Sequence, residues 1–109
     1  MITGLSAKKC VPCEGGVAPL MHTEAEALIK ETPQWNLSKD WKSIARDFTF
    51  KDFKEAMVFV NHVADVAETE QHHPDISVSW NKVTIELWTH AIGGLSENDF
   101  IVAAKIELI

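Results

Sequence analysis

The hydrophobic positions change period along the chain, and the longest regular stretch follows Asp52. From that residue, apolar side chains recur at steps of three and four over about five turns, which predicts an amphipathic helix. The positions that carry the pattern are Phe53, Ala56, Met57, Val60, Val63, Ala64 and Ala67. The helix must end by His73, because Pro74 disfavours helical geometry in the residue before it.

Alternating apolar and polar residues on both sides of this helix predict two β-hairpins. Before the helix, a short strand at 35–37 is joined by a polar turn to a second strand at 42–50. After the helix, alternating runs at 76–80 and 83–88 are joined by Asn81-Lys82.

Shorter helices are predicted near the two ends of the folded region. Thr23, with Glu26 three residues later, forms a capping-box pattern that opens a helix stopping before Pro33. Gly93-Gly94 ends the last strand, and Ser96 caps a final helix. The predicted order is therefore α-β-β-α-β-β-α. Two hairpins around a long helix indicate an α+β fold, a four-stranded antiparallel sheet with helices on one face.

Residues 1–22 differ from the rest of the chain in composition. They hold both cysteines, two of the four prolines and three of the five glycines, so we expect an irregular arm ahead of a single domain at 23–109. Cys10 and Cys13 have the spacing of half a zinc site or of a redox pair. Zinc would need two further ligands, and a redox pair would need a helix start in a βαβ unit. We therefore expect reduced thiols with a minor structural role.

Charge and hydropathy exclude several classes of function. Ten Lys and Arg against 16 Asp and Glu give a net charge of −6, which repels nucleic-acid phosphates. No apolar run approaches the roughly 20 residues that a membrane span needs, and the N-terminus lacks a signal-peptide pattern. We expect a cytoplasmic protein.

Trp88 points away from the apolar face of its strand, which favours a covered sheet face and a homo-oligomer.

The histidines carry the strongest chemical signal. His72 and His73 stand at the junction of the long helix and a strand, and His90 follows the return strand of the same hairpin. Because the second strand of a hairpin ends beside the start of the first, the three imidazoles should meet in one cleft. Three histidines can hold zinc, but adjacent side chains in extended backbone point apart. We therefore favour metal-free acid–base chemistry, for which imidazole is suited at neutral pH.

Three other residues have both a structural and a functional interpretation. Glu68 lies four residues before His72, where its carboxylate either orients that imidazole or forms a surface pair. Asp99 is the last residue of a Ser-x-x-Asp cap and also a candidate for the cleft. Trp80, at the hairpin turn, either packs or stacks on a planar heterocycle.

Taken together, these residues resemble the pterin-4a-carbinolamine dehydratases, a family that includes dimerisation cofactors of a homeodomain transcription factor. The resemblance runs from about residue 20 to 108 and has one departure, Trp80, where tyrosine is common. The matching segments are Glu68-x-x-x-His72-His73-Pro74, Trp80-Asn81-Lys82-Val83, Leu87-Trp88-Thr89-His90 and Gly94-Leu95-Ser96-Glu97-Asn98-Asp99.

The resemblance implies dehydration of 4a-hydroxytetrahydrobiopterin to quinonoid dihydrobiopterin without a metal or cofactor, by a homodimer or homotetramer. It implies that His72 and His90 act as acid and base, in an order left open, and that His73 binds substrate. Further contacts with the pterin are implied for Glu68, Pro74, Trp80 and Asp99. Relatives also act as coactivators or assembly factors, and another pterin, such as a molybdopterin intermediate, is an alternative substrate.

Overall fold

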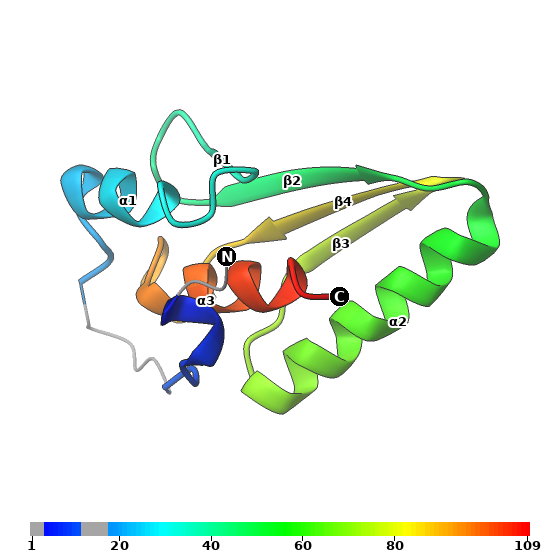
Figure 1. Cartoon of the computed structure of the whole chain (residues 1–109). Coiled ribbons are helices and arrows are strands. Elements are labelled where there is room, and N and C mark those ends of the chain that lie inside the picture. The colour runs from blue at the N-terminus through cyan, green and yellow to red at the C-terminus, as the bar shows by residue number, and fades with distance from the viewer. Residues whose placement is uncertain (1–3, 12–17) are drawn as a thin grey trace.

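The computed structural model describes residues 4–11 and 18–109 and contains a four-stranded antiparallel sheet with strand order β1-β2-β4-β3 (Figure 1). The predicted α+β class and element order are confirmed, with two short 3-10 helices (η1 and η2) in addition. The elements are η1 (Gly4–Ala7), α1 (His22–Ile29), β1 (Asn36–Leu37), β2 (Ile44–Thr49), α2 (Phe53–Glu70), β3 (Asp75–Ser79), β4 (Lys82–Leu87), η2 (His90–Ile92) and α3 (Glu97–Ile106).

The core lies between the sheet and the helices α2 and α3. On β4, Val83, Ile85 and Leu87 are fully buried, as the period-two pattern predicts for one face of a strand. Helix α3 is apolar on nearly every side and is buried along most of its length, so it forms the centre of the domain. Both helices lie below the sheet in the view of Figure 1.

Helix α2 begins and ends at residues with specific local chemistry. At its start, the Asp52 carboxylate accepts a hydrogen bond from the Glu55 backbone N–H at 2.9 Å. At its end, Gln71 adopts a left-handed conformation with φ 53°, and the His72 N–H bonds to the Ala67 carbonyl at 3.2 Å. The helix thus ends before His73, as predicted, and the chain changes direction at the two adjacent histidines.

The start of α1 corrects the sequence prediction by two residues. The helix begins at His22, and Met21 is the capping residue. The Met21 N–H donates to the Glu24 side chain, whereas the sequence predicts a capping box between Thr23 and Glu26. The reason is a contact distant in sequence, because the Leu20 N–H is bonded to the Leu95 carbonyl at 2.8 Å. This bond fixes where the chain enters the helix.

The second hairpin turns one residue earlier than predicted. Ser79 pairs with Lys82, so Trp80 and Asn81 form the turn and Lys82 already belongs to β4. Trp80 has φ 50° and is 65% exposed. The turn bonds to residue 50, just before α2 begins, and therefore lies at the end of the hairpin opposite His72.

The described part of the N-terminal arm packs on the domain. Leu5, within η1, is 2% exposed and belongs to the core, and η1 lies against α3. Within the described residues, no helix is long and apolar enough to cross a membrane.

Candidate active site

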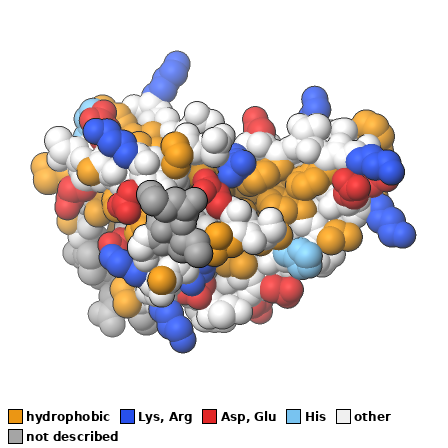
Figure 2. Space-filling view, in the orientation of Figure 1, with side chains coloured by type: hydrophobic (Ala, Val, Ile, Leu, Met, Phe, Trp, Pro, Cys, Tyr) orange, Lys and Arg blue, Asp and Glu red, His pale blue; other side chains and the backbone are white. Residues whose placement is uncertain are grey.

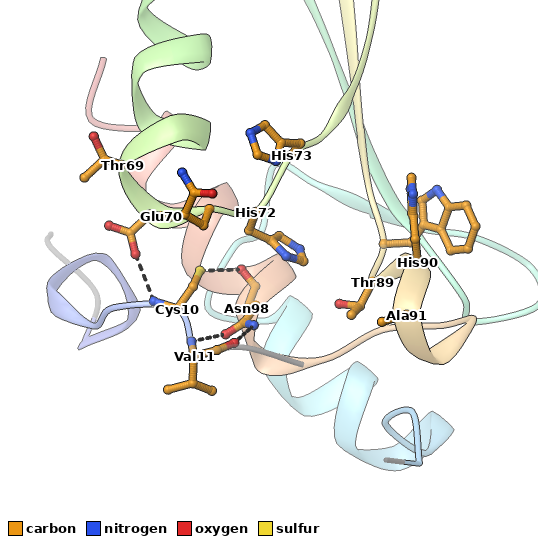
Figure 3. A pocket seen from close by; sticks show the side chains of 12 residues that line it. Cys10, Val11, Thr69, Glu70, His72, His73, Thr89, His90, Ala91 and Asn98 are labelled. Carbon is orange, nitrogen blue, oxygen red and sulfur yellow. Dashed lines mark hydrogen bonds between the residues drawn. The ribbon is translucent and has the colours of Figure 1, made fainter. Parts of the chain in front are cut away.

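A pocket of about 540 Å³ opens where α2 ends and β4 leaves the sheet (Figure 3). The structure brings His72, His73 and His90 together in its lining, which is the convergence that hairpin geometry predicts. Its volume falls within the range of roughly 300–1,000 Å³ that is usual for small-molecule sites. The full lining is Cys10, Val11, Thr69, Glu70, Gln71, His72, His73, Trp88, Thr89, His90, Ala91 and Asn98.

His72 is the most constrained of the three histidines. Its side chain is 11% exposed, and its Nε2 lies 2.6 Å from Oδ1 of Asp99, which is fully buried behind it. A buried carboxylate at this distance fixes the plane of the imidazole. The structure thus pairs His72 with Asp99, not with Glu68.

The surroundings of Asp99 identify which ring nitrogen of His72 carries hydrogen. The second carboxylate oxygen accepts bonds from the Thr89 hydroxyl at 2.8 Å and from the Ser96 N–H at 2.9 Å. With two donors already on this group, Asp99 is an acceptor toward His72 as well. An ionised Asp99 places the ring hydrogen of neutral His72 on Nε2 and leaves Nδ1 as the nitrogen for proton exchange.

Glu68 pairs with His73 at the rim of the pocket. Its Oε2 lies 2.5 Å from Nε2 of His73, and both side chains are more than half exposed. The predicted pairing with His72 at four-residue spacing is wrong, because the left-handed Gln71 ends the helical register before His72 is reached. An exposed pair of this kind contributes little to stability.

The opposite side of the pocket is aromatic. The rings of Trp88 and His90 have centroids 3.9 Å apart and planes tilted by 40°, and the indole N–H of Trp88 donates to Oδ2 of Asp75 at 3.0 Å. Nε2 of His90 lies 4.0 Å from the same oxygen. Sequence analysis missed Trp88 and Asp75 as site residues. The i, i+2 spacing of Trp88 and His90 was an available signal, since such residues share a face of extended chain.

Four predicted site residues do not line this pocket, namely Glu68, Pro74, Trp80 and Asp99. Trp80 is at the far end of the β3–β4 hairpin, and neither Trp80 nor Pro74 belongs to the lining. Asp99 reaches the site only through His72. The expected stacking of a heterocycle on Trp80 therefore has no counterpart in this pocket, where Trp88 supplies the indole surface.

Cys10 is a pocket residue with a protonated thiol. Burial, followed by the negative charge of Glu70, raises the pKa of the Cys10 thiol from 9.0 to about 12. Zinc binding and disulfide exchange both require thiolate, so the environment of Cys10 agrees with the expected minor structural role. Cys13 lies outside the described residues.

Within the described residues, no group of three or more His, Cys, Asp or Glu side chains is arranged to hold a metal ion.

The pocket therefore combines the His72–Asp99 pair, two further imidazoles and an indole, which are the groups that acid–base chemistry on a small molecule requires. Comparison with known proteins identifies the family. The model of the pterin 4 alpha carbinolamine dehydratase family matches residues 18–109, so the chain belongs to this family and to the hydro-lyase class of enzymes.

Individual relatives agree with the family match. A protein of Nitrosomonas eutropha is 51% identical over 99% of this chain and 95% of its own length. A protein of Halorhodospira halophila is 47% identical over 96% of both chains. Both bear the name "Putative pterin-4-alpha-carbinolamine dehydratase". A crystal structure of a transcriptional coactivator/pterin dehydratase from Brucella melitensis is 31% identical, with a TM-score of 0.78 over 83% of this chain and 96% of that one.

Proposed function

We propose that the protein dehydrates 4a-hydroxytetrahydrobiopterin to quinonoid dihydrobiopterin and thereby serves tetrahydrobiopterin recycling, in the cytoplasm. The observation that carries this proposal is the 2.6 Å contact of His72 with buried Asp99 beside His73 and His90. Family membership supplies the substrate class, and the pocket supplies groups that can move the protons of the reaction.

The reaction removes water without any change of oxidation state. The C4a–O bond breaks as the hydroxyl leaves with an added proton, N5 loses its proton, and a C4a=N5 double bond forms. One group must therefore donate a proton and another must accept one, and each positioned acid or base contributes about 10²–10⁴-fold. We assign these two roles to His72 and His90. Either order balances the reaction.

The remaining side chains of the pocket serve binding. His73, oriented by Glu68, is placed to contact the pterin at the rim. The indole of Trp88, whose plane is tilted by 40° from that of the His90 ring, offers an aromatic face for a planar bicycle. Trp80 and Pro74 have no part in this assignment, because they do not line the pocket.

A second role in assembly or transcription is favoured by one observation. The Brucella melitensis protein, which shares the fold at 31% identity, is described as both coactivator and pterin dehydratase. A binding role makes no demand on the acid–base groups of the pocket, so the two roles are compatible in one chain.

The dehydratase is tested by mixing the purified protein with synthetic 4a-hydroxytetrahydrobiopterin and following loss of water by mass spectrometry. We expect turnover far above the uncatalysed rate. His72→Ala should lower kcat by about 10²–10⁴-fold. Activity should survive dialysis against a chelator, because the described His, Cys, Asp and Glu side chains include no group of three or more that could hold a metal ion. A wild-type rate equal to the blank would overturn the proposal and favour the binding role.

A further inference from the structure

Asp75 lies behind the aromatic side of the pocket and has no role in the reaction as assigned above. It is the first residue of β3, and it pairs across the sheet with Glu86 of β4. Trp88 lies two residues beyond Glu86, so it is a diagonal neighbour of Asp75 on the same face of the sheet. The register of the sheet therefore brings the Asp75 carboxylate within reach of the indole.

One carboxylate oxygen of Asp75 faces both rings at this side of the pocket. Oδ2 accepts the indole N–H of Trp88 at 3.0 Å and lies 4.0 Å from Nε2 of His90. The centroids of the two rings are 3.9 Å apart. Asp75, Trp88 and His90 thus form a group in which each member adjoins the other two, and both rings belong to the pocket lining.

The nearest like charge is turned away from this oxygen. Glu86, directly across the sheet from Asp75, accepts a hydrogen bond from the Ser43 hydroxyl at 3.0 Å. Ser43 immediately precedes β2, which lies on the side of β4 opposite β3. The Glu86 carboxylate is therefore held toward β2, and that of Asp75 faces the two rings.

This arrangement parallels the one on the other side of the pocket. Figure 3 shows His90 across the pocket from His72, and each imidazole has a carboxylate that lies outside the lining. The His72 contact is buried and measures 2.6 Å, whereas the His90 contact joins half-exposed side chains at 4.0 Å. A separation of 4.0 Å exceeds a hydrogen bond, but such contacts in a free enzyme often shorten when substrate binds.

We propose that Asp75 is a positioning residue that holds the His90 imidazole in place, directly and through the Trp88 indole. The inference rests on the proposed dehydratase function, in which His90 donates or accepts a proton. The side chain of His90 is more than half exposed, so several rotamers are open to it unless neighbouring groups restrict them. The indole, itself fixed by its hydrogen bond to Asp75, and the carboxylate are the groups that do so.

Kinetics of Asp75→Ala and Asp75→Asn test this role, with circular dichroism to verify folding. Asp75→Ala removes the acceptor of the indole N–H, and kcat should fall by about tenfold, less than the roughly 10²-fold cost of a group displaced by about 1 Å. Asp75→Asn keeps an oxygen acceptor and should stay within about threefold of wild type. Asp47→Ala is the matched control, because Asp47 is an exposed carboxylate that accepts from the Thr84 hydroxyl and lies outside the pocket lining.

A His90→Ala background separates positioning from a general structural effect. If Asp75 acts through His90, Asp75→Ala should change kcat by less than about twofold once the imidazole is absent. An equal loss of kcat in the two backgrounds would overturn the inference. So would wild-type kcat in Asp75→Ala alone.

NMR measures the ring contact independently of turnover. Because the ring centroids are 3.9 Å apart, the indole should displace the His90 ring signals from those of a free imidazole. These signals are assigned by their loss in His90→Ala. Asp75→Ala should return them toward the free values, and Asp47→Ala should leave them unchanged. His90 signals that stay at their wild-type positions in Asp75→Ala would refute the positioning role, whereas absence of turnover by the wild-type protein would refute the dehydratase function and leave this contact to be decided by NMR.

Discussion

Asp99 is the residue on which the geometry of the site most depends. Three donors converge on its carboxylate, from His72, Thr89 and Ser96, so one buried charge fixes the imidazole, the segment after β4 and the start of α3 together. Asp99 does not line the pocket, and we propose that it acts as a positioning residue whose effect on the reaction passes through the tautomer of His72.

Replacing this carboxylate by an amide should reverse that tautomer. In Asp99→Asn, the Thr89 and Ser96 donors retain the amide oxygen, so the NH2 group faces Nε2 of His72 and moves the ring hydrogen to Nδ1. We expect kcat to fall by about 10²–10⁴-fold, with an altered pH profile. Steady-state kinetics across pH, with circular dichroism to verify folding, tests this. Glu68→Gln, at an exposed pair, is the control and should change KM more than kcat; equal losses of kcat in the two variants would contradict the assignment.

Cys10 provides a pH-dependent prediction at the same scale. Because its pKa is raised to about 12, the folded state holds the thiol protonated above pH 9, where an unfolded chain releases the proton. Alkylation by iodoacetamide at pH 8 should therefore be slow until the protein unfolds. Glu70→Gln removes a charge that raises this pKa and should accelerate alkylation. Peptide mass spectrometry in a Cys13→Ser background resolves the site, and rapid alkylation in the native wild-type protein would refute the prediction.

At the scale of elements, the end of α2 decides which carboxylate pairs with which histidine. The period of the apolar residues predicts this helix well, because a 3.6-residue repeat is local information. The hairpin return likewise predicts that His90 lies near His72 and His73. No comparable sequence pattern marks the left-handed conformation of Gln71. Because this conformation ends the helix before His72, Glu68 pairs with His73 instead of His72. The arm contacts were also beyond sequence reasoning, since Val11 and Asn98 are 87 residues apart.

The start of α2 provides a stability prediction that leaves the site unchanged. Asp52→Ala removes the side-chain acceptor for the Glu55 N–H and should lower the free energy of unfolding by about 1 kcal/mol. The change lies at the end of the helix opposite His72, so kcat should stay at its wild-type value. Asp65→Ala, at an exposed position within α2, is the matched control and should cost less than the cap variant. Urea unfolding measures both, and an equal effect of the two substitutions would contradict the capping role.

At the scale of the whole molecule, apolar side chains remain at the surface. Figure 2 shows hydrophobic side chains exposed between the sheet and α2. Four large ones stand on α2, on β3 or at the turn that follows it, namely Phe53, Val58, Val78 and Trp80. Strand β3 is also an edge of the sheet, with backbone groups available for pairing. We propose that these surfaces join copies of the chain into a homo-oligomer.

Sedimentation at micromolar concentration should therefore give a dimer or a larger species. Val78→Lys places a charge on the edge strand, and Val58→Lys places one on α2. The variant whose assembly sediments with the lower mass identifies the surface that is buried between copies of the chain. A wild-type monomer would contradict the proposal.

The central claim is that His72 and His90 form one acid–base pair, and a double-mutant cycle tests it most directly. The measurement is kcat for dehydration of 4a-hydroxytetrahydrobiopterin by the wild-type protein, His72→Ala, His90→Ala and the double variant, with circular dichroism to verify folding. Each single substitution should lower kcat by about 10²–10⁴-fold. The double variant should lose less than the product of the two losses, because proton transfer fails once either end is missing. Wild-type kcat in both single variants would contradict the account.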